Sequence, residues 1–160
     1  MHHWLGQLPD SLAARWRWFW GLRRRPDTAA SHRGQLGEEA AARLVTQRGW
    51  KIIARNWRHG RDELDLVAWD GNVLVFAEVR ARGAQAVVSG YHSVTGRKTR
   101  ALARAVKAYL RGMADPPRHF RFDIIEVKVS DGMAHEVLLH ANIPLLPKNF
   151  SPTRGFGRKL

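Results

Sequence analysis

Apolar and polar residues alternate through residues 62–82, which is the pattern of β-strands. Apolar, β-branched runs flank the dipeptide Asp70-Gly71. Asp-Gly favours a two-residue type I′ turn, because both central residues of that turn need a positive φ. With Asp70 and Gly71 as the loop, Trp69 pairs with Asn72. The pattern therefore predicts an antiparallel hairpin with a fixed register.

The same register places Phe76 opposite Asp65 and Glu78 opposite Glu63. One face of the hairpin is then apolar and suited to a core: Leu64, Leu66, Ala68, Val73, Val75, Ala77 and Val79. The other face gathers charged residues, namely Glu63, Asp65, Glu78 and Arg80. Like charges across a strand pair repel, and a divalent cation such as Mg²⁺ removes that conflict. The spacing Asp65-x12-Glu78-x-Arg80 indicates the metal site of a phosphodiester-cleaving enzyme, while a half-exposed hairpin shows the same alternation without any metal.

A helix is predicted over residues 34–48, with Gly49 as its C-terminal stop. Helical spacing puts Glu38 on the buried side of this helix, with apolar neighbours Ala41, Ala42 and Val45. Glu39 is rotated away and reads as a surface acid. Residues 50–58 form a strand that, with the hairpin, predicts a three-stranded antiparallel meander.

A second helix is predicted over residues 95–112. Its apolar side holds Leu102, Ala105, Val106, Tyr109 and Met113, and its opposite side holds five cations, Arg97, Arg100, Arg104, Lys107 and Arg111. Such a line of cations suits a phosphate backbone, and the alternative is a solvated helix face. Strands over residues 121–129 and 135–143 complete the predicted elements. His135, Glu136 and His140 do not have zincin spacing.

The length of 160 residues predicts one domain, over residues 31–146. Residues 1–30 read as a basic, Trp-rich extension that is poorly ordered. It could contact a membrane surface, nucleic acid or a partner protein, or pack on the domain itself. Residues 147–160 read as a basic tail. No uncharged run in the extension approaches the ~20 residues of a membrane span. Residues 83–93 read as a mobile loop. The absence of cysteine excludes disulfides and suits the cytoplasm.

The distribution of charge along the chain indicates what kind of partner the protein binds. The net charge is +13, yet residues 34–80 are neutral because they hold seven of the 14 acidic residues. A confined acidic cluster on a basic body suits a polyanion that the body binds and the cluster processes. A soluble protein with an Arg-rich composition is the alternative.

The order of motifs resembles the PD-(D/E)xK restriction-endonuclease-like superfamily, in the form of Holliday-junction resolvases. Four segments look like the bacterial YraN family: GEEAAARLVTQRGWKIIARNWR, DELDLVAWDGNVLVFAEVRAR, SVTGRKTRAL and RFDIIEV. The resemblance covers residues 33–143. It implies an α/β (α+β) fold with a restriction-endonuclease-like core and a mixed central sheet.

The resemblance implies that Asp65 and Glu78 are catalytic metal ligands and that Glu38 and the Val79 carbonyl complete the Mg²⁺ or Mn²⁺ site. Glu63 would lie beside them, where it could hold a second ion or orient water. Arg80, the third catalytic residue, stands where the family pattern has Lys. Its guanidinium keeps its charge, so it can stabilise or position the phosphate but cannot help to activate water, and activity could be reduced or lost. Thr99 replaces the Gln that usually follows Lys98. The residues expected to bind nucleic acid are Arg82, Arg97, Lys98, Arg100, Arg104, Lys107 and Arg111.

These features together predict a metal-dependent endonuclease that cleaves branched or single-stranded DNA, and the resemblance implies that it leaves 5′-phosphate and 3′-hydroxyl ends. A catalytically silent nucleic-acid-binding module with a nuclease fold is the alternative, and a scaffold that recruits a partner through its N-terminus is a third. RNA as substrate and a homodimer are left open by the sequence.

Overall fold

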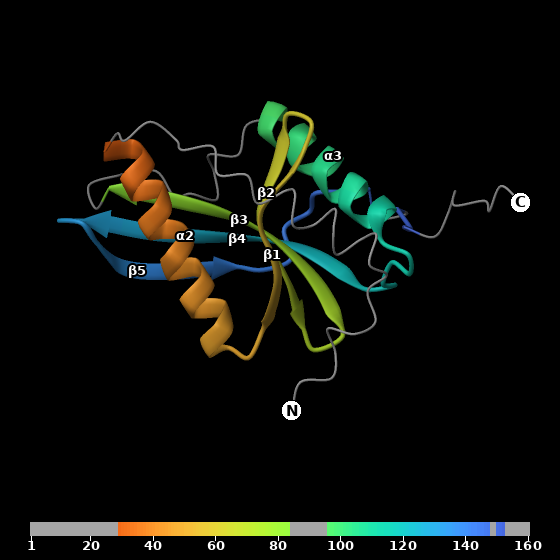
Figure 1. Cartoon of the computed structure of the whole chain (residues 1–160), viewed down its shortest axis with the longest axis horizontal. Coiled ribbons are helices and arrows are strands. Elements are labelled where there is room, and N and C mark those ends of the chain that lie inside the picture. The colour runs from red at the N-terminus through yellow and green to blue at the C-terminus, as the bar shows by residue number, and fades with distance from the viewer. Residues whose placement is uncertain (1–28, 84–95, 148–149, 153–160) are drawn as a thin grey trace, which may run out of the picture.

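The fold is a five-stranded sheet with one helix on each face (Figure 1). It comes from a computed structural model that describes residues 29–83, 96–147 and 150–152. The expected N-terminal extension and the 83–93 loop therefore lie almost wholly outside the described residues. In chain order the elements are α2 (Ala29–Gln47), β1 (Lys51–His59), β2 (Asp62–Asp70), β3 (Val73–Gly83), α3 (Gly96–Gly112), β4 (Phe120–Ser130) and β5 (Met133–His140).

The strands lie in the order β1-β2-β3-β4-β5. The first three form the predicted antiparallel meander, β4 runs parallel to β3, and β5 is antiparallel to β4. A parallel neighbour requires a crossover, and α3 lies within that connection. The predicted α+β class with a mixed sheet is confirmed. Helix α2 already covers Ala29, five residues before its predicted start.

The predicted hairpin register was wrong by one turn residue. Asp70 pairs with Val73, so the loop is Gly71-Asn72 rather than Asp70-Gly71. Gly71 has a φ of 57°, which fits a turn with glycine at its first central position. Asp70 stays in the strand because its carboxylate accepts a hydrogen bond from Arg121 at 2.9 Å. This moves the pairing by two residues, so most side chains keep their predicted face.

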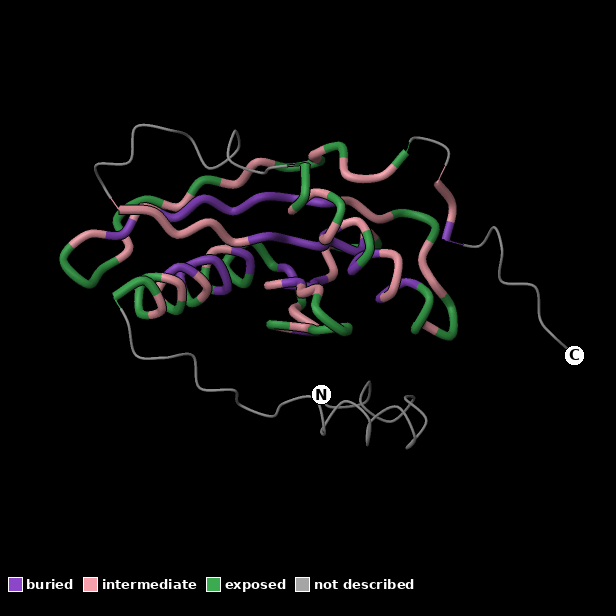
Figure 2. The backbone as a smooth tube through the Cα atoms, turned by 90° about the horizontal axis from the view of Figure 1, so that it is seen from above, coloured by how far each residue is buried: buried purple, intermediate pink, exposed green. Residues whose placement is uncertain are grey.

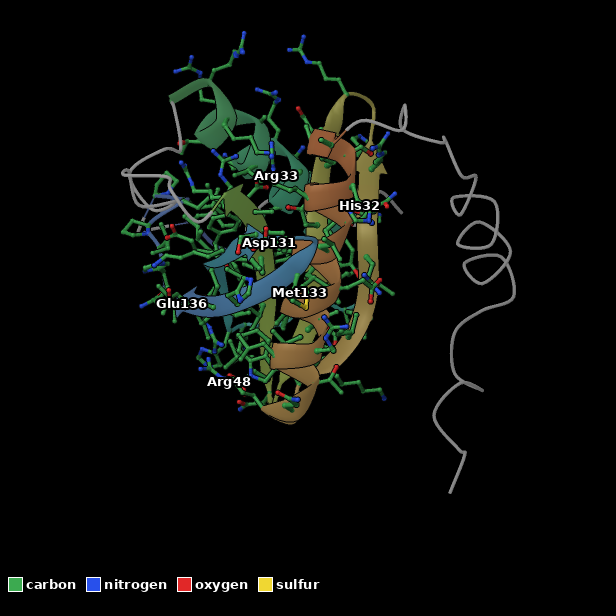
Figure 3. The ribbon with its side chains drawn as sticks, turned by 90° about the vertical axis from the view of Figure 1, so that its left-hand side faces the viewer. His32, Arg33, Arg48, Asp131, Met133 and Glu136 are labelled. Atoms are coloured by element: carbon green, nitrogen blue, oxygen red, sulfur yellow. The ribbon has the colours of Figure 1, made fainter. Side chains whose placement is uncertain are left out.

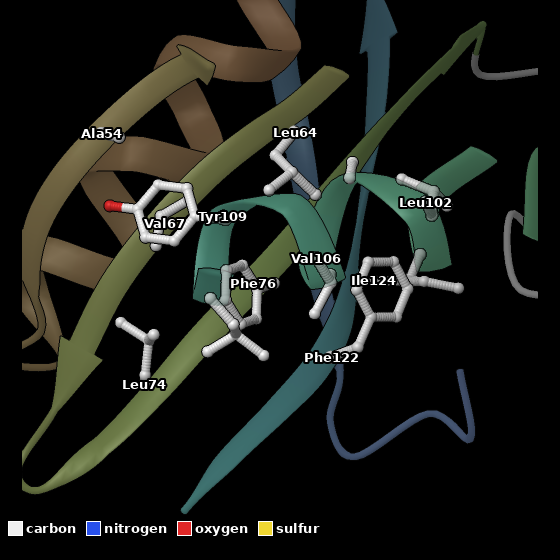
Figure 4. Close-up of a cluster of buried hydrophobic side chains, with 12 residues drawn as sticks. Ala54, Leu64, Val67, Leu74, Phe76, Leu102, Val106, Tyr109, Phe122 and Ile124 are labelled. Atoms are coloured by element: carbon white, nitrogen blue, oxygen red, sulfur yellow. The ribbon is translucent and has the colours of Figure 1, made fainter. Parts of the chain in front are cut away.

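Each face of the sheet has its own core. Helix α2 covers one face, where Leu66, Ala68, Val75 and Ala77 are buried with Ala41 and Val45. Helix α3 covers the other face, where Leu74, Phe76 and Ile124 pack against Leu102, Val106 and Tyr109 (Figure 4). Leu64 packs in this second core, not in the first as predicted. The face predicted to be charged is therefore apolar along most of its length, and Figure 2 shows buried residues along the middle of the sheet.

Helix α2 approaches β3 closely at one glycine. A Cβ atom at Gly37 would lie 2.6 Å from the Cβ of Ala81 on β3, which is closer than two non-bonded carbon atoms approach. The missing side chain lets the helix backbone rest on the strand. Glu38, the next residue, is thereby brought to the cavity that Glu78 of β3 also lines.

A buried carboxylate connects the hairpin turn to the chain after β5. Asp123 is fully buried and accepts hydrogen bonds from Arg121 Nε at 3.0 Å and from the Asn142 backbone N–H at 2.8 Å. Burial raises the pKa of Asp123. Phe150 packs edge-on against Phe120, so the folded part continues beyond residue 146.

Figure 3 views the layers from the side, with α2 next to the β4–β5 hairpin labelled at Asp131 and Met133. Asp131 and Gly132 both have positive φ values, of 50° and 72°, and Ser130 pairs with Met133. This second Asp-Gly dipeptide thus forms the two-residue turn with both φ values positive that was expected of Asp70-Gly71. Neither described helix carries an apolar stretch long enough to cross a bilayer.

Candidate metal and phosphate site

The candidate site lies where β2 and β3 part. Their pairing runs from Asp70–Val73 to Leu66–Ala77. Beyond that point the start of β2 continues to pair with β1, and β3 continues to pair with β4. We call the opening between the separated ends of β2 and β3 the fork. In the fork, the Val79 backbone N–H donates a hydrogen bond to Asp65 Oδ2 at 2.8 Å. A side chain of β2 therefore takes the place of a backbone partner.

The fork opens into a cavity of about 200 Å³. Its lining combines charged side chains and backbone from α2, β2, β3 and α3: Gly34, Glu38, Glu63, Asp65, Glu78, Val79, Arg80, Ala81 and Lys98. Pockets for drug-sized ligands are usually ~300–1,000 Å³. The space therefore suits an ion and a phosphate group better than a whole organic ligand.

Glu78 is the most buried of these acids, with 2% of its surface exposed. Its Oε1 lies 3.0 Å from Lys98 Nζ and 3.5 Å from Arg80. Its Oε2 is buried and has no hydrogen-bond partner among the described residues. A buried carboxylate oxygen without a donor is costly, so this atom is placed to bind a cation.

Asp65 is the second acid of the fork. Burial, and after it the nearby Glu78 carboxylate, raises the pKa of Asp65 to about 8. The Val79 N–H and the Lys98 ammonium act in the opposite direction. Two carboxylates are thus held close together, and burial and the charge of Glu78 both favour the protonated form of Asp65.

Glu38 and Glu39 have different surroundings despite their adjacency. Glu38 lines the cavity, and its Oε2 accepts a hydrogen bond from Asn56 Nδ2 at 2.9 Å. Glu39 is exposed and pairs with Arg55 at 2.8 Å, which fits the surface role expected for it. Glu63 lines the cavity too, and is paired with Arg58 at 2.9 Å.

The structure brings together every residue predicted for the metal site, but not as a complete cage. No group of three acidic, histidine or cysteine side chains in the described ranges is arranged to hold an ion. Mg²⁺ needs only one or two carboxylates when waters and substrate phosphate oxygens supply its other ligands. Asp65 and the unpartnered oxygen of Glu78 meet that need, so the residues fit such an ion.

The predicted line of five cations on α3 is divided. Arg104 forms a two-pronged salt bridge to Asp62 of β2, with N–O distances of 2.8 and 2.7 Å. The Lys107 ammonium lies 5.5 Å above the Phe150 ring. Arg97, Arg100 and Arg111 are exposed and form the outer part of the line. On β3, Arg82 Nε is buried without a hydrogen-bond partner among the described residues.

Sequence reasoning missed two contacts of the site. Lys98, which is predicted to bind nucleic acid, also contacts Glu78 inside the cavity. Asn56 was not singled out, although it contacts Glu38. Its occurrence inside a strand was the available signal, because asparagine is disfavoured there.

Comparison with known proteins assigns the family. Residues 37–127, more than half of the chain, match the family described as "Uncharacterised protein family UPF0102". A UPF0102 protein of Symbiobacterium thermophilum is 44% identical over 95 residues, which are 59% of this chain and 80% of the relative. One from Chlorobaculum tepidum is 42% identical over 94 residues, covering 59% of this chain and 73% of the relative. The matched region contains α2 after its first turns, the fork between β2 and β3, helix α3 and most of β4, and the chain belongs to the UPF0102 (YraN) family.

Proposed function

We propose that this protein is a divalent-metal-dependent endonuclease that hydrolyses phosphodiester bonds of DNA. The observation that carries the proposal is Glu78, a buried acid with one oxygen held by Lys98 and the other without a partner among the described residues. Asp65 lies beside it with a raised pKa. A divalent cation would relieve both conflicts, because it would bind the unpartnered oxygen of Glu78 and favour the ionised form of Asp65.

Asp65 and Glu78 would hold Mg²⁺ or Mn²⁺, with the Val79 carbonyl and Glu38 at the same cavity. The ion, when bound, would supply Lewis-acid polarisation of the phosphate and a lowered pKa for water. Lys98 and Arg80 flank Glu78 and would stabilise the negative charge that develops on the phosphate oxygens. Glu63, which also lines the cavity, would orient water there.

A polyanionic substrate fits the charge of the protein. The chain carries +13, and Arg97, Arg100 and Arg111 are exposed on the helix that also supplies Lys98 to the cavity. A phosphate backbone along α3 would therefore pass the mouth of the site. Branched or single-stranded DNA is the proposed form, because a strand must reach a fork that is only about 200 Å³ in volume.

The test is a cleavage assay on a panel of linear, flap and four-way DNA, with Mg²⁺, Mn²⁺ or EDTA. We expect metal-dependent products on at least one branched or single-stranded substrate, and none with Asp65→Ala. Equal cleavage by the parent and the variant would refute the role of the fork. An RNA strand of the same sequence tests whether the sugar matters.

A second function is favoured by one observation, the arginine at position 80. A guanidinium cannot give up its proton to help activate water. On this second hypothesis the protein is a catalytically silent nucleic-acid-binding module. It would bind the DNA panel, but neither the parent protein nor Arg80→Lys would cleave any of these substrates with any of the metals.

A further inference from the structure

Asn56 has a backbone conformation that is rare inside a strand. Its φ is 51°, in the left-handed region, although it lies within β1. Few residues other than glycine adopt this region, and asparagine is among those that tolerate it best. Such conformations persist when the surrounding structure requires them, and they cluster at functional sites.

The conformation changes which way β1 side chains point. Successive strand residues normally face opposite sides of a sheet. Here Arg55 and Asn56 both reach glutamates of α2, with Arg55 on Glu39 and Asn56 on Glu38. Trp57 then returns to the other core, where its ring lies 5.1 Å from that of Tyr109. The left-handed residue thus delivers a second consecutive side chain to the same helix.

Arg55 and Asn56 bring different chemical groups to the two glutamates. Arg55 brings a positive charge to Glu39 at 2.8 Å, outside the cavity. Asn56 brings a neutral amide to Glu38 at 2.9 Å, and Glu38 lines the cavity. A neutral donor orients a carboxylate and leaves its negative charge in place. Carboxylates that bind metal ions are usually held in this way by a hydrogen bond from a neighbouring group.

We propose that Asn56 is a positioning residue that holds the Glu38 carboxylate toward a divalent cation bound by Asp65 and Glu78. The inference rests on the proposed function, since it needs that ion. The inference explains why β1 holds a residue in the left-handed conformation. It also assigns Glu38 to the site, because Glu38 lines the cavity and contacts Asn56, whereas Glu39 pairs with Arg55 outside it. Asn56 itself would not touch the ion or the substrate.

The test measures Mn²⁺ affinity of the full chain by electron paramagnetic resonance in the absence of DNA. Four variants are compared with the parent: Asn56→Gly, Glu38→Gln, the double variant and, as a matched control, Arg55→Ala. Glycine tolerates the left-handed φ and removes only the amide. Loss of a group that orients a metal ligand typically weakens metal affinity by ~10–100-fold. We expect a loss in that range for Asn56→Gly and an unchanged affinity for Arg55→Ala.

The double variant decides whether Asn56 acts through Glu38. Two residues in one chain of contacts are non-additive, so Asn56→Gly should weaken binding no further once Glu38→Gln is present. Parental affinity in Asn56→Gly, or additive losses in the double variant, would overturn the inference. Melting curves without metal check that each variant is folded. If Asn56→Gly does not fold, Asn56→Ser takes its place, because the serine hydroxyl is too short to reach Glu38. A parent that binds no Mn²⁺ would instead refute the proposed function.

Discussion

Lys98 Nζ lies 3.0 Å from Glu78 Oε1, so the first turn of α3 supplies a lysine to an acid at the centre of β3. The strand position that the family pattern gives to lysine holds Arg80, whose guanidinium lies 3.5 Å from the same oxygen. Two cations of different chemistry therefore meet one carboxylate oxygen. The other oxygen is left for the proposed metal.

This contact predicts that Lys98 matters more than its position on a basic helix suggests. We expect Lys98→Gln to lower single-turnover cleavage by ~100-fold or more, the usual cost of removing one donor aimed at developing charge. Arg97→Gln, the adjacent exposed cation, should weaken DNA binding without that loss of rate. Equal effects of the two substitutions on the rate would show that Lys98 only adds to the positive charge of α3.

Stability should depend on pH through Asp65. Its carboxyl keeps its proton to about pH 8 when folded, because its pKa is raised from 3.8, so the folded state binds more protons between those values. The contribution of Asp65 to stability is therefore present at low pH and lost as the pH rises toward 8. We expect the metal-free melting temperature to fall more from pH 5 to pH 8 in the parent than in Asp65→Asn. Mn²⁺ at pH 8 should raise the melting temperature of the parent and leave that of Asp65→Asn nearly unchanged.

A parent and an Asp65→Asn variant with parallel pH profiles would contradict this role for Asp65. Glu39→Gln serves as the control, because Glu39 is exposed and ion-paired outside the cavity. It should leave both the pH profile and the Mn²⁺ effect as they are in the parent.

The cations of α3 should separate into two groups. Neutralising the exposed Arg97 and Arg100 together should flatten the dependence of log affinity on log salt by ~2 units, since each phosphate that a cation neutralises contributes about 0.9 to the slope. Arg104→Gln should change the salt slope less and lower the melting temperature, because Arg104 is held by Asp62. Fluorescence anisotropy on one DNA at several salt concentrations measures the slopes. A larger change of slope for Arg104→Gln than for the Arg97 and Arg100 pair would contradict the division.

The glycine at the approach of α2 to β3 predicts a large effect from one methyl group. Gly37→Ala would set two Cβ atoms 2.6 Å apart, so α2 must shift away from Ala81. Overpacking of this kind costs about 1–3 kcal/mol of unfolding free energy, even though alanine favours helices. Urea denaturation measures the loss, with Gly112→Ala as the control, since a Cβ there meets no atom within 4 Å. A Gly37→Ala variant as stable as the parent would show that the helix can move without cost.

Much of the fold could be predicted because short-range patterns determine it. The alternation of residues 62–82 identified the hairpin, and an error of one residue in the turn left Leu66 and Val75 on their correct face, since the pairing moved by two. The turn itself was ambiguous because Asp70 has a distant partner, Arg121, 51 residues away. Local sequence propensity holds no information about such a distant partner.

The same limit explains what was missed at the site. Asp65 and Glu78 could be identified as candidate site residues, because they lie on adjacent strands of one predicted hairpin. The Arg104–Asp62 salt bridge joins residues 42 apart, and the Asn56–Glu38 bond joins a strand to a helix that precedes it. Both depend on how α2 and α3 pack on the sheet, and that packing is set by the whole core rather than by any one segment.

The most direct test of the metal-centred fork is a pair of measurements on Glu78→Gln, which keeps the shape of the side chain and removes its charge. Cleavage of the best DNA substrate in Mn²⁺ is compared with the affinity for the same DNA in EDTA. We expect cleavage to fall below detection while the affinity stays within about threefold of the parent, a change of less than ~1 kcal/mol. Cleavage at the parental rate by Glu78→Gln would contradict the proposal that this buried acid holds the catalytic ion.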